Sequence, residues 1–203
     1  LCVGQARGVL KMILTRGLAG RGYQAVEAEP ACLLLLYPMP GHPASHWQTG
    51  IQVRICETRL AQNPRLAGIK HLNRLEQVLA RAEWSNAAIA EGLMLDTDNR
   101  LIEGVSSNLF LVRDSKLLTP DLSRCGIAGV MREMILEAAP AYTKAVQVQD
   151  LSMTDLLAAD ECFVCNSIIG IWPVTGLEGK RWDIGPMTRK LQQHFSDVCP
   201  PVA

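Results

Sequence analysis

The sequence predicts a mixed α/β fold of the α+β kind, in which hairpin-linked strands alternate with helices. Two hairpins carry this prediction. One joins residues 93–95 to 101–102 across a polar turn, and the other joins residues 109–112 to 117–118. Apolar residues at helical spacing between 72 and 82 place an amphipathic helix before them. This mixture is not typical of a regular doubly wound sheet.

The other elements follow from shorter patterns. Apolar or alternating runs predict strands at residues 32–37, 51–55, 146–148 and 162–165. The first of these is a continuous apolar run and reads as a buried strand. Helices are predicted over 130–139, after the Ser152-x-x-Asp155 N-cap pattern, and from Pro186 onward. Three prolines and a glycine within residues 38–43 predict a linker.

Composition narrows the class of protein. The chain has 203 residues, 48% of them hydrophobic, which is enough for one domain or two small ones. Its formal net charge of zero gives no long-range attraction to nucleic acid or an anionic membrane. No apolar stretch approaches the roughly 20 residues of a membrane span, and no signal peptide is visible. Seven cysteines, an odd number, favour a reducing cytosol and hence a cytoplasmic protein.

Several superficial motifs do not point to chemistry. Cys162 and Cys165 stand three apart on a predicted strand, so their side chains face opposite ways and cannot share a metal ion. The glycines at 17, 20 and 22 match neither the dinucleotide fingerprint nor a P-loop. The four histidines share no spacing typical of a metal site. No metal is therefore predicted.

Two charged residues, Lys70 and Glu103, can be interpreted only together with the segments around them. Lys70 ends an apolar stretch and precedes the predicted helix, but a lone lysine is usually a solvated surface group. Glu103 lies on a predicted hairpin strand, where a carboxylate is most often a charge at a sheet edge. Neither residue by itself indicates a function.

Taken together, these segments resemble the fold-type IV enzymes that use pyridoxal phosphate (PLP). This family contains branched-chain aminotransferases, D-amino-acid aminotransferases and 4-amino-4-deoxychorismate lyases. The matching segments are Gly-Ile-Lys-His-Leu-Asn-Arg-Leu-Glu at 68–76, Glu103-x-x-x-x-Asn108-Leu109-Phe110, Leu-Leu-Thr-Pro at 117–120, Gly-Ile-Ala-Gly-Val-Met-Arg at 126–132, Cys-Asn-Ser-Ile at 165–168 and Trp-Pro-Val at 172–174. Val105 departs from the pattern, since a smaller residue is usual there. The resemblance runs from about Val9 to the C-terminus.

The resemblance implies a role for each matched residue. Lys70 is the catalytic lysine that holds PLP covalently, and its neutral amine then acts as a base. Glu103 faces the pyridine nitrogen, because a protonated ring accepts electrons better. The backbone N–H groups of Val130 and Met131 open a helix and suit the phosphate, to which Ser167 adds a hydroxyl.

The segment Arg16-Gly17, then Gly-Arg-Gly-Tyr at 20–23, resembles the family's substrate loop in its lyase form. The implied substrate-binding residues are Arg21 and Tyr23, with the arginine binding a carboxylate through two hydrogen bonds.

By the same resemblance, residues 1–40 are the C-terminal part of a small N-terminal domain, and residues 41–203 are the large PLP-binding domain. The family's small domain normally also supplies an arginine to the PLP phosphate, and no counterpart stands in this sequence. Either the sequence is incomplete or PLP binds weakly.

Within the family, Lys-His-Leu-Asn-Arg-Leu-Glu at 70–76 is most similar to the aminodeoxychorismate lyases. The resemblance implies conversion of 4-amino-4-deoxychorismate to 4-aminobenzoate and pyruvate, for folate biosynthesis. Two alternatives stay open: a branched-chain or D-amino-acid aminotransferase, and a non-catalytic remnant of the fold. The expected partners are a small-molecule substrate and a second copy of the chain in a homodimer, with no nucleic acid and no membrane.

Overall fold

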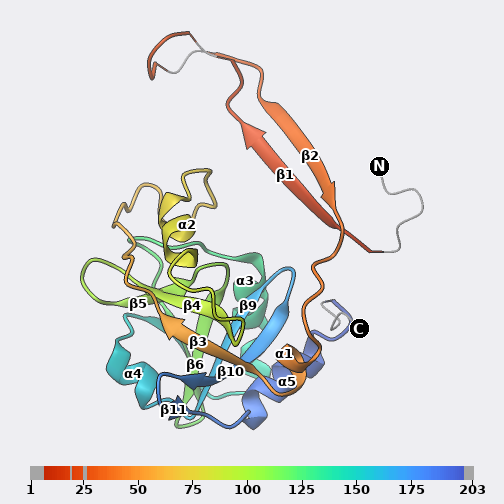
Figure 1. Ribbon diagram of the computed structural model, residues 1–203, viewed down its shortest axis with the longest axis vertical. Coiled ribbons are helices and arrows are strands. Elements are labelled where there is room, and N and C mark those ends of the chain that lie inside the picture. The colour runs from red at the N-terminus through yellow and green to blue at the C-terminus, as the bar shows by residue number, and fades with distance from the viewer. Residues whose placement is uncertain (1–6, 19, 25–26, 199–203) are drawn as a thin grey trace. The chain divides into compact units, whose positions relative to one another are not determined.

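The computed structural model describes residues 7–18, 20–24 and 27–198, and it divides into two compact units, Leu1–His42 and Pro43–Ala203 (Figure 1). In the first unit, β1 (Val9–Thr15) pairs antiparallel with β2 (Ala31–Tyr37). The strand predicted at 32–37 is confirmed, but the prediction that it is buried is wrong within this unit. Leu33 and Leu34 are 45% and 47% exposed, because a two-stranded ribbon leaves both of its faces open.

The second unit is built on one nine-stranded sheet. Its strands are β3 (Ile51–Ile55), β4 (Ile89–Leu95), β5 (Leu101–Gly104), β6 (Asn108–Arg113), β7 (Lys116–Pro120), β8 (Val146–Gln149), β9 (Glu161–Asn166), β10 (Gly170–Leu177) and β11 (Lys180–Arg181). Because β9 pairs with both β6 and β10, the path from β10 through β3, β4, β5 and β6 closes into a ring. Pairing in β3–β4, β3–β10 and β7–β8 is parallel, and the other strand pairs are antiparallel.

The helices are short and lie outside the ring (Figure 1). They are α1 (Ser45–Gln48), α2 (Leu75–Arg81), α3 (Val130–Ala138), η1 (Ala139–Ala141), α4 (Met153–Leu157) and α5 (Pro186–His194). Alternate residues of β6 enter two different cores. Leu109 and Leu111 join the cluster that contains Trp47 of α1, whereas Phe110 and Val112 join the cluster formed with α3 and α5.

The structure confirms the mixed fold class and both predicted hairpins, which are β4–β5 and β6–β7. A capping box at Ser152 begins α4, as predicted, and Pro186 opens α5. The helix expected over 72–82 is shorter, and its larger apolar side chains do not face the core. Leu75 and Val78 are each 62% exposed, while Gln77 and Ala80 are the buried members of α2.

A buried carboxylate fixes the start of α5. Glu161 is 5% exposed and accepts hydrogen bonds from the backbone N–H of Met187 (3.1 Å) and of Thr188 (2.8 Å), and from the Thr188 hydroxyl (2.7 Å). A Cβ added at Gly185 would stand 2.0 Å from the Glu161 carboxyl carbon, so this close approach requires glycine. These bonds satisfy N–H groups that a helix start leaves unpaired.

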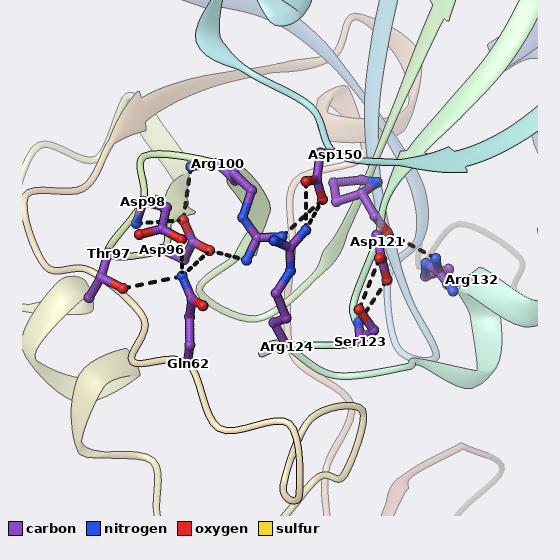
Figure 2. Close-up of polar contacts among 11 residues, drawn as sticks. Gln62, Asp96, Thr97, Asp98, Arg100, Asp121, Ser123, Arg124, Arg132 and Asp150 are labelled. Carbon is purple, nitrogen blue, oxygen red and sulfur yellow. Dashed lines mark hydrogen bonds and ion pairs between the residues drawn. The ribbon is translucent and has the colours of Figure 1, made fainter.

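An ionic network steadies the loop that leads to Lys70 (Figure 2). Asp96, which is fully buried, pairs with Arg100, and Arg100 and Arg124 both bind Asp150. The Gln62 amide donates to Asp96 (3.2 Å) and to the Asp98 carboxylate (2.7 Å). The residue after Gln62 donates its N–H to the carbonyl of Arg124 at 2.8 Å. The β4–β5 turn and the 121–125 segment therefore both bind residues 62–63 of the loop that leads to Lys70.

Within the described residues, no helix has both the length and the apolar character needed to cross a membrane. Four of the described cysteines are free thiols, namely Cys32, Cys56, Cys125 and Cys162. Cys162 and Cys165 belong to different core clusters, which confirms that their side chains face opposite ways. Over the same residues, no group of three or more His, Cys, Asp or Glu side chains is arranged to hold a metal ion.

Candidate active site

The site is organised around one short segment, residues 126–128, that leads into α3. The N–H of Gly68 donates to the Gly126 carbonyl (2.9 Å), and the N–H of Ala128 donates to the Gly68 carbonyl (3.0 Å). Gly126 has φ +87°, and a Cβ there would stand 2.8 Å from side-chain atoms of Ile102 and Leu122. A glycine is therefore required where the segment passes the sheet and binds the lysine loop.

Lys70 lies two residues after this pairing, in an exposed stretch before α2. Arg74 holds the backbone on both sides of it. The Arg74 Nε donates to the carbonyl of His71 at 2.8 Å, and its Nη2 donates to the carbonyl of Ile69 at 2.9 Å. The planar fork of a guanidinium can bind two acceptors at once, so the lysine backbone is fixed while its amine stays accessible.

Glu103 enters the site from β5 with only 2% of its surface exposed. Its Oε2 accepts the backbone N–H of Ile127 at 2.8 Å, while its Oε1 is buried and has no hydrogen-bond partner. Burial raises the pKa of Glu103 to about 7, against the opposing effects of the Ile127 hydrogen bond and the charges of Arg74 and Lys70. An unpartnered buried carboxyl oxygen is costly, and a protonated ligand nitrogen would satisfy it.

This raised pKa predicts a pH-dependent stability in the protein without added ligand. The folded state releases the Glu103 proton at about pH 7, while the unfolded state releases it near its model value of 4.5. The stability from the protonated form is present below pH 4.5 and is lost as the pH rises through 7. We expect the free energy of unfolding to fall by up to about 3 kcal/mol over this range, relative to Glu103→Gln. Denaturant titrations with parallel pH curves for both proteins would contradict this.

The start of α3 forms a second polar surface. Gly129 is extended, and no side chain caps the helix. The Asn108 amide donates to the carbonyl of Ile127 at 2.7 Å, and a Cβ at Gly129 would stand 2.2 Å from the Asn108 Oδ1. In the first turn, Val130 is 68% exposed whereas Met131 is 2% exposed. The side chain of Met131 therefore belongs to the core, and only its backbone N–H can serve an anion at this helix end.

The remaining predicted residues lie in two other places. Ser167 is exposed in the turn between β9 and β10. The Oδ1 of Asn166 orders this turn by accepting the N–H groups of Ile168 (2.8 Å) and Ile169 (2.9 Å). Arg21 and Tyr23 are exposed residues of the first unit, so their part in a shared site stays a prediction.

Sequence reasoning missed three residues that shape the site. Arg74 and Asn108 stood within matched motifs without an assigned role. Glu91 lies outside the strand predicted at 93–95, yet it belongs to β4, is 4% exposed and binds the Gly104–Ser107 turn. No local pattern indicated that this carboxylate points inward.

The fold and the site define an enzyme class, and the comparison of sequences agrees with it. Residues 2–177 match the family described as Amino-transferase class IV. Since this match covers most of the chain, the protein belongs to the class IV aminotransferase family, as the resemblance of its motifs indicated.

Particular relatives point further, to the lyase branch. The aminodeoxychorismate lyase of Vibrio harveyi is 42% identical over 192 residues, which are 92% of this chain and 71% of that protein. The crystal structure of 4-amino-4-deoxychorismate lyase from Pseudomonas aeruginosa superposes with a TM-score of 0.92 at 54% identity, covering 95% of this chain and 72% of that one. The branched-chain amino acid aminotransferase of Escherichia coli has a TM-score of 0.78 at 26% identity, covering 97% and 66%.

Proposed function

We propose that this chain is a PLP-dependent lyase that converts 4-amino-4-deoxychorismate to 4-aminobenzoate and pyruvate. The observation that carries the proposal is one shared segment. Residues 126–128 bind the Lys70 loop on one side and the buried Glu103 on the other. The choice of the lyase over an aminotransferase rests on the 42% and 54% identities to lyases, against 26% to the aminotransferase.

The residues present fit PLP at both ends of the cofactor. The unpartnered Oε1 of Glu103 is suited to a protonated pyridine nitrogen, which would supply the hydrogen bond that the carboxylate lacks. The uncapped start of α3 is suited to the phosphate through the backbone N–H groups of Val130 and Met131. In this proposal Ser167 adds its hydroxyl, and Lys70 provides the covalent bond.

PLP, when bound, supplies an aldehyde that condenses with amines and a ring that takes up the electron pair left at a deprotonated carbon. The chain supplies the proton transfers. The amine of Lys70 accepts the proton from the amine-bearing carbon of the substrate. Glu103 keeps a proton at the ring nitrogen. The ether bond then breaks, enolpyruvate leaves and takes up a proton to become pyruvate, and the remaining ring becomes aromatic.

Binding of the substrate and of a second copy completes the proposal. Arg21 and Tyr23 would bind a substrate carboxylate. We expect a homodimer from the family resemblance, and four exposed apolar side chains near Lys70 support it: Ile69 (53%), Leu72 (69%), Leu75 (62%) and Val78 (62%). Contact between two copies would remove this apolar surface from water. A cytoplasmic location and a place in folate biosynthesis stay predictions.

The fate of the substrate nitrogen separates a lyase from an aminotransferase. A lyase leaves the nitrogen on its product and needs no second substrate, whereas an aminotransferase transfers it to the cofactor. We expect the full chain saturated with PLP to form 4-aminobenzoate and pyruvate from aminodeoxychorismate over many turnovers, without any keto acid. Chromatography of the aromatic product and a coupled assay for pyruvate measure both outputs.

The matched experiment mixes the same protein with D-alanine or with leucine. Little of the cofactor should change into its amine form, which is followed by absorbance. Rapid, stoichiometric conversion by an amino acid, with no aromatic product from aminodeoxychorismate, would replace the lyase with the aminotransferase. A chain that binds PLP but does neither would favour the non-catalytic alternative.

A further inference from the structure

A second buried carboxylate lies beside Glu103 and takes no part in the chemistry proposed above. Glu91, on β4, is 4% exposed. Its Oε2 accepts three hydrogen bonds from the Gly104–Ser107 turn: from the N–H of Ser106 (3.2 Å), the hydroxyl of Ser106 (2.8 Å) and the hydroxyl of Ser107 (2.9 Å). Its Oε1 accepts the N–H of Gly92 at 2.9 Å.

The turn that Glu91 holds connects the parts of the site with each other. It joins Glu103 to Asn108, which stand opposite each other across β5 and β6. On one side, Asn108 donates to the carbonyl of Ile127, just before the start of α3. On the other side, the carbonyl of Ser106 accepts the Asn166 amide at 2.9 Å. Asn166 in turn orders the backbone around Ser167.

We propose that Glu91 is a positioning residue for the phosphate end of the PLP site. Its carboxylate fixes the Gly104–Ser107 turn, and this turn sets the two groups that would receive the phosphate, the start of α3 and the turn that carries Ser167. The inference rests on the proposed function and deepens it. It also gives a reason for two consecutive serines in the hairpin, whose hydroxyls both point at one carboxylate oxygen.

The donors around Glu91 require a carboxylate. Both of its oxygens are acceptors, whereas a glutamine side chain offers one acceptor oxygen and one NH₂ donor. If the NH₂ group replaced Oε1, it would meet the N–H of Gly92. If it replaced Oε2, it would meet the N–H of Ser106, while the two hydroxyls would have to turn and become acceptors. In either placement the NH₂ group faces a backbone N–H in a buried position, where neither donor has an acceptor. The turn must therefore shift to separate the two donors.

The experiment compares the binding of PLP with the binding of pyridoxal, which has the same ring and aldehyde but no phosphate. Dissociation constants are measured by absorbance for the wild-type chain and for Glu91→Gln. We expect the affinity for PLP to fall about tenfold or more, because one misplaced buried bond is enough for such a change. The affinity for pyridoxal should stay within roughly twofold, since the ring contacts of Glu103 are retained.

Glu161→Gln is the matched control. Glu161 is also a buried carboxylate with two backbone N–H groups and one hydroxyl as donors, but it stands at the opposite end of β9 from Asn166. The Glu161→Gln protein should lose about as much thermal stability as the Glu91→Gln protein. It should not change the ratio of the affinity for PLP to the affinity for pyridoxal. Ser106→Ala, which removes only the 2.8 Å bond, should change the ratio in the same direction by a smaller factor, and it serves if Glu91→Gln does not fold.

The outcomes are distinct from those that test the lyase activity. Equal losses for PLP and pyridoxal, an unchanged ratio in both site variants, or the same change in Glu161→Gln would overturn the positioning role. A wild-type chain that binds PLP no better than pyridoxal would overturn the phosphate site together with this inference. A chain that discriminates as expected but makes no 4-aminobenzoate would leave the inference intact and refute only the lyase.

Discussion

Replacing Lys70 with alanine is expected to reduce the formation of 4-aminobenzoate by roughly three powers of ten or more. In the proposed mechanism the variant loses both the amine that holds PLP and the base that accepts the substrate proton, and a loss of this order is typical for a general base. The exposed Lys70 is not a core residue, so the fold should survive the change. Activity is followed by the appearance of the aromatic product.

Chemical trapping identifies the lysine directly. Borohydride should fix PLP to a single lysine of the wild-type chain, and peptide mapping should find it at Lys70. Lys144, another exposed lysine, provides the control, because Lys144→Ala should keep both the adduct and the activity. An adduct at one of the other lysines would refute the assignment; these are Lys11, Lys116, Lys144, Lys180 and Lys190.

The second large effect is expected at Glu103. Glu103→Gln keeps the size of the side chain and removes the negative charge that would hold a proton on the ring nitrogen. PLP should still bind, but turnover should fall by roughly one to several powers of ten, since each ~1.4 kcal/mol of lost transition-state stabilisation is a factor of ten. Single-turnover rates with saturating substrate separate this loss from any change in binding.

Glu137→Gln is a suitable control for charge alone, since Glu137 is exposed on α3. Its turnover should match the wild-type value. A Glu103→Gln protein as active as the wild type would show that this carboxylate does not serve the ring nitrogen. The buried, unpartnered Oε1 would then need a different ligand group.

The sequence predicted the elements whose signals are local. Both hairpins, the N-cap at Ser152 and the helix from Pro186 depend on turn and capping residues within a few positions of each other, and all of them are present. The parallel pairing of β3 with β10 joins residues more than a hundred positions apart. No local pattern specifies such a pair, so the closed ring of strands was not predicted.

Apolar periodicity misled at α2 for a physical reason. The pattern through Leu75, Val78 and Leu79 correctly indicated an apolar helix face, but periodicity does not tell what covers that face. In this unit the face is exposed, and the buried members of the helix are Gln77 and Ala80, of which Ala80 packs with Met94 of β4. Glu91 stood outside the strand predicted at 93–95, so its place in β4 was not predicted either. Alternation along a strand shows which residues share a face, but not that a polar residue is bound by a hairpin beyond the strand.

The hydrogen bonds of residues 126–128 have a consequence for how such an enzyme can change during evolution. One stretch of backbone binds the Lys70 loop and the buried Glu103, and it leads into the helix proposed to meet the phosphate. A substitution such as Gly126→Ala would displace all three together, because its Cβ has no room beside Ile102 and Leu122. Selection for a new substrate therefore cannot adjust one of these parts through this stretch without disturbing the others. Substitutions that change the substrate are therefore expected in loops that do not contact the cofactor.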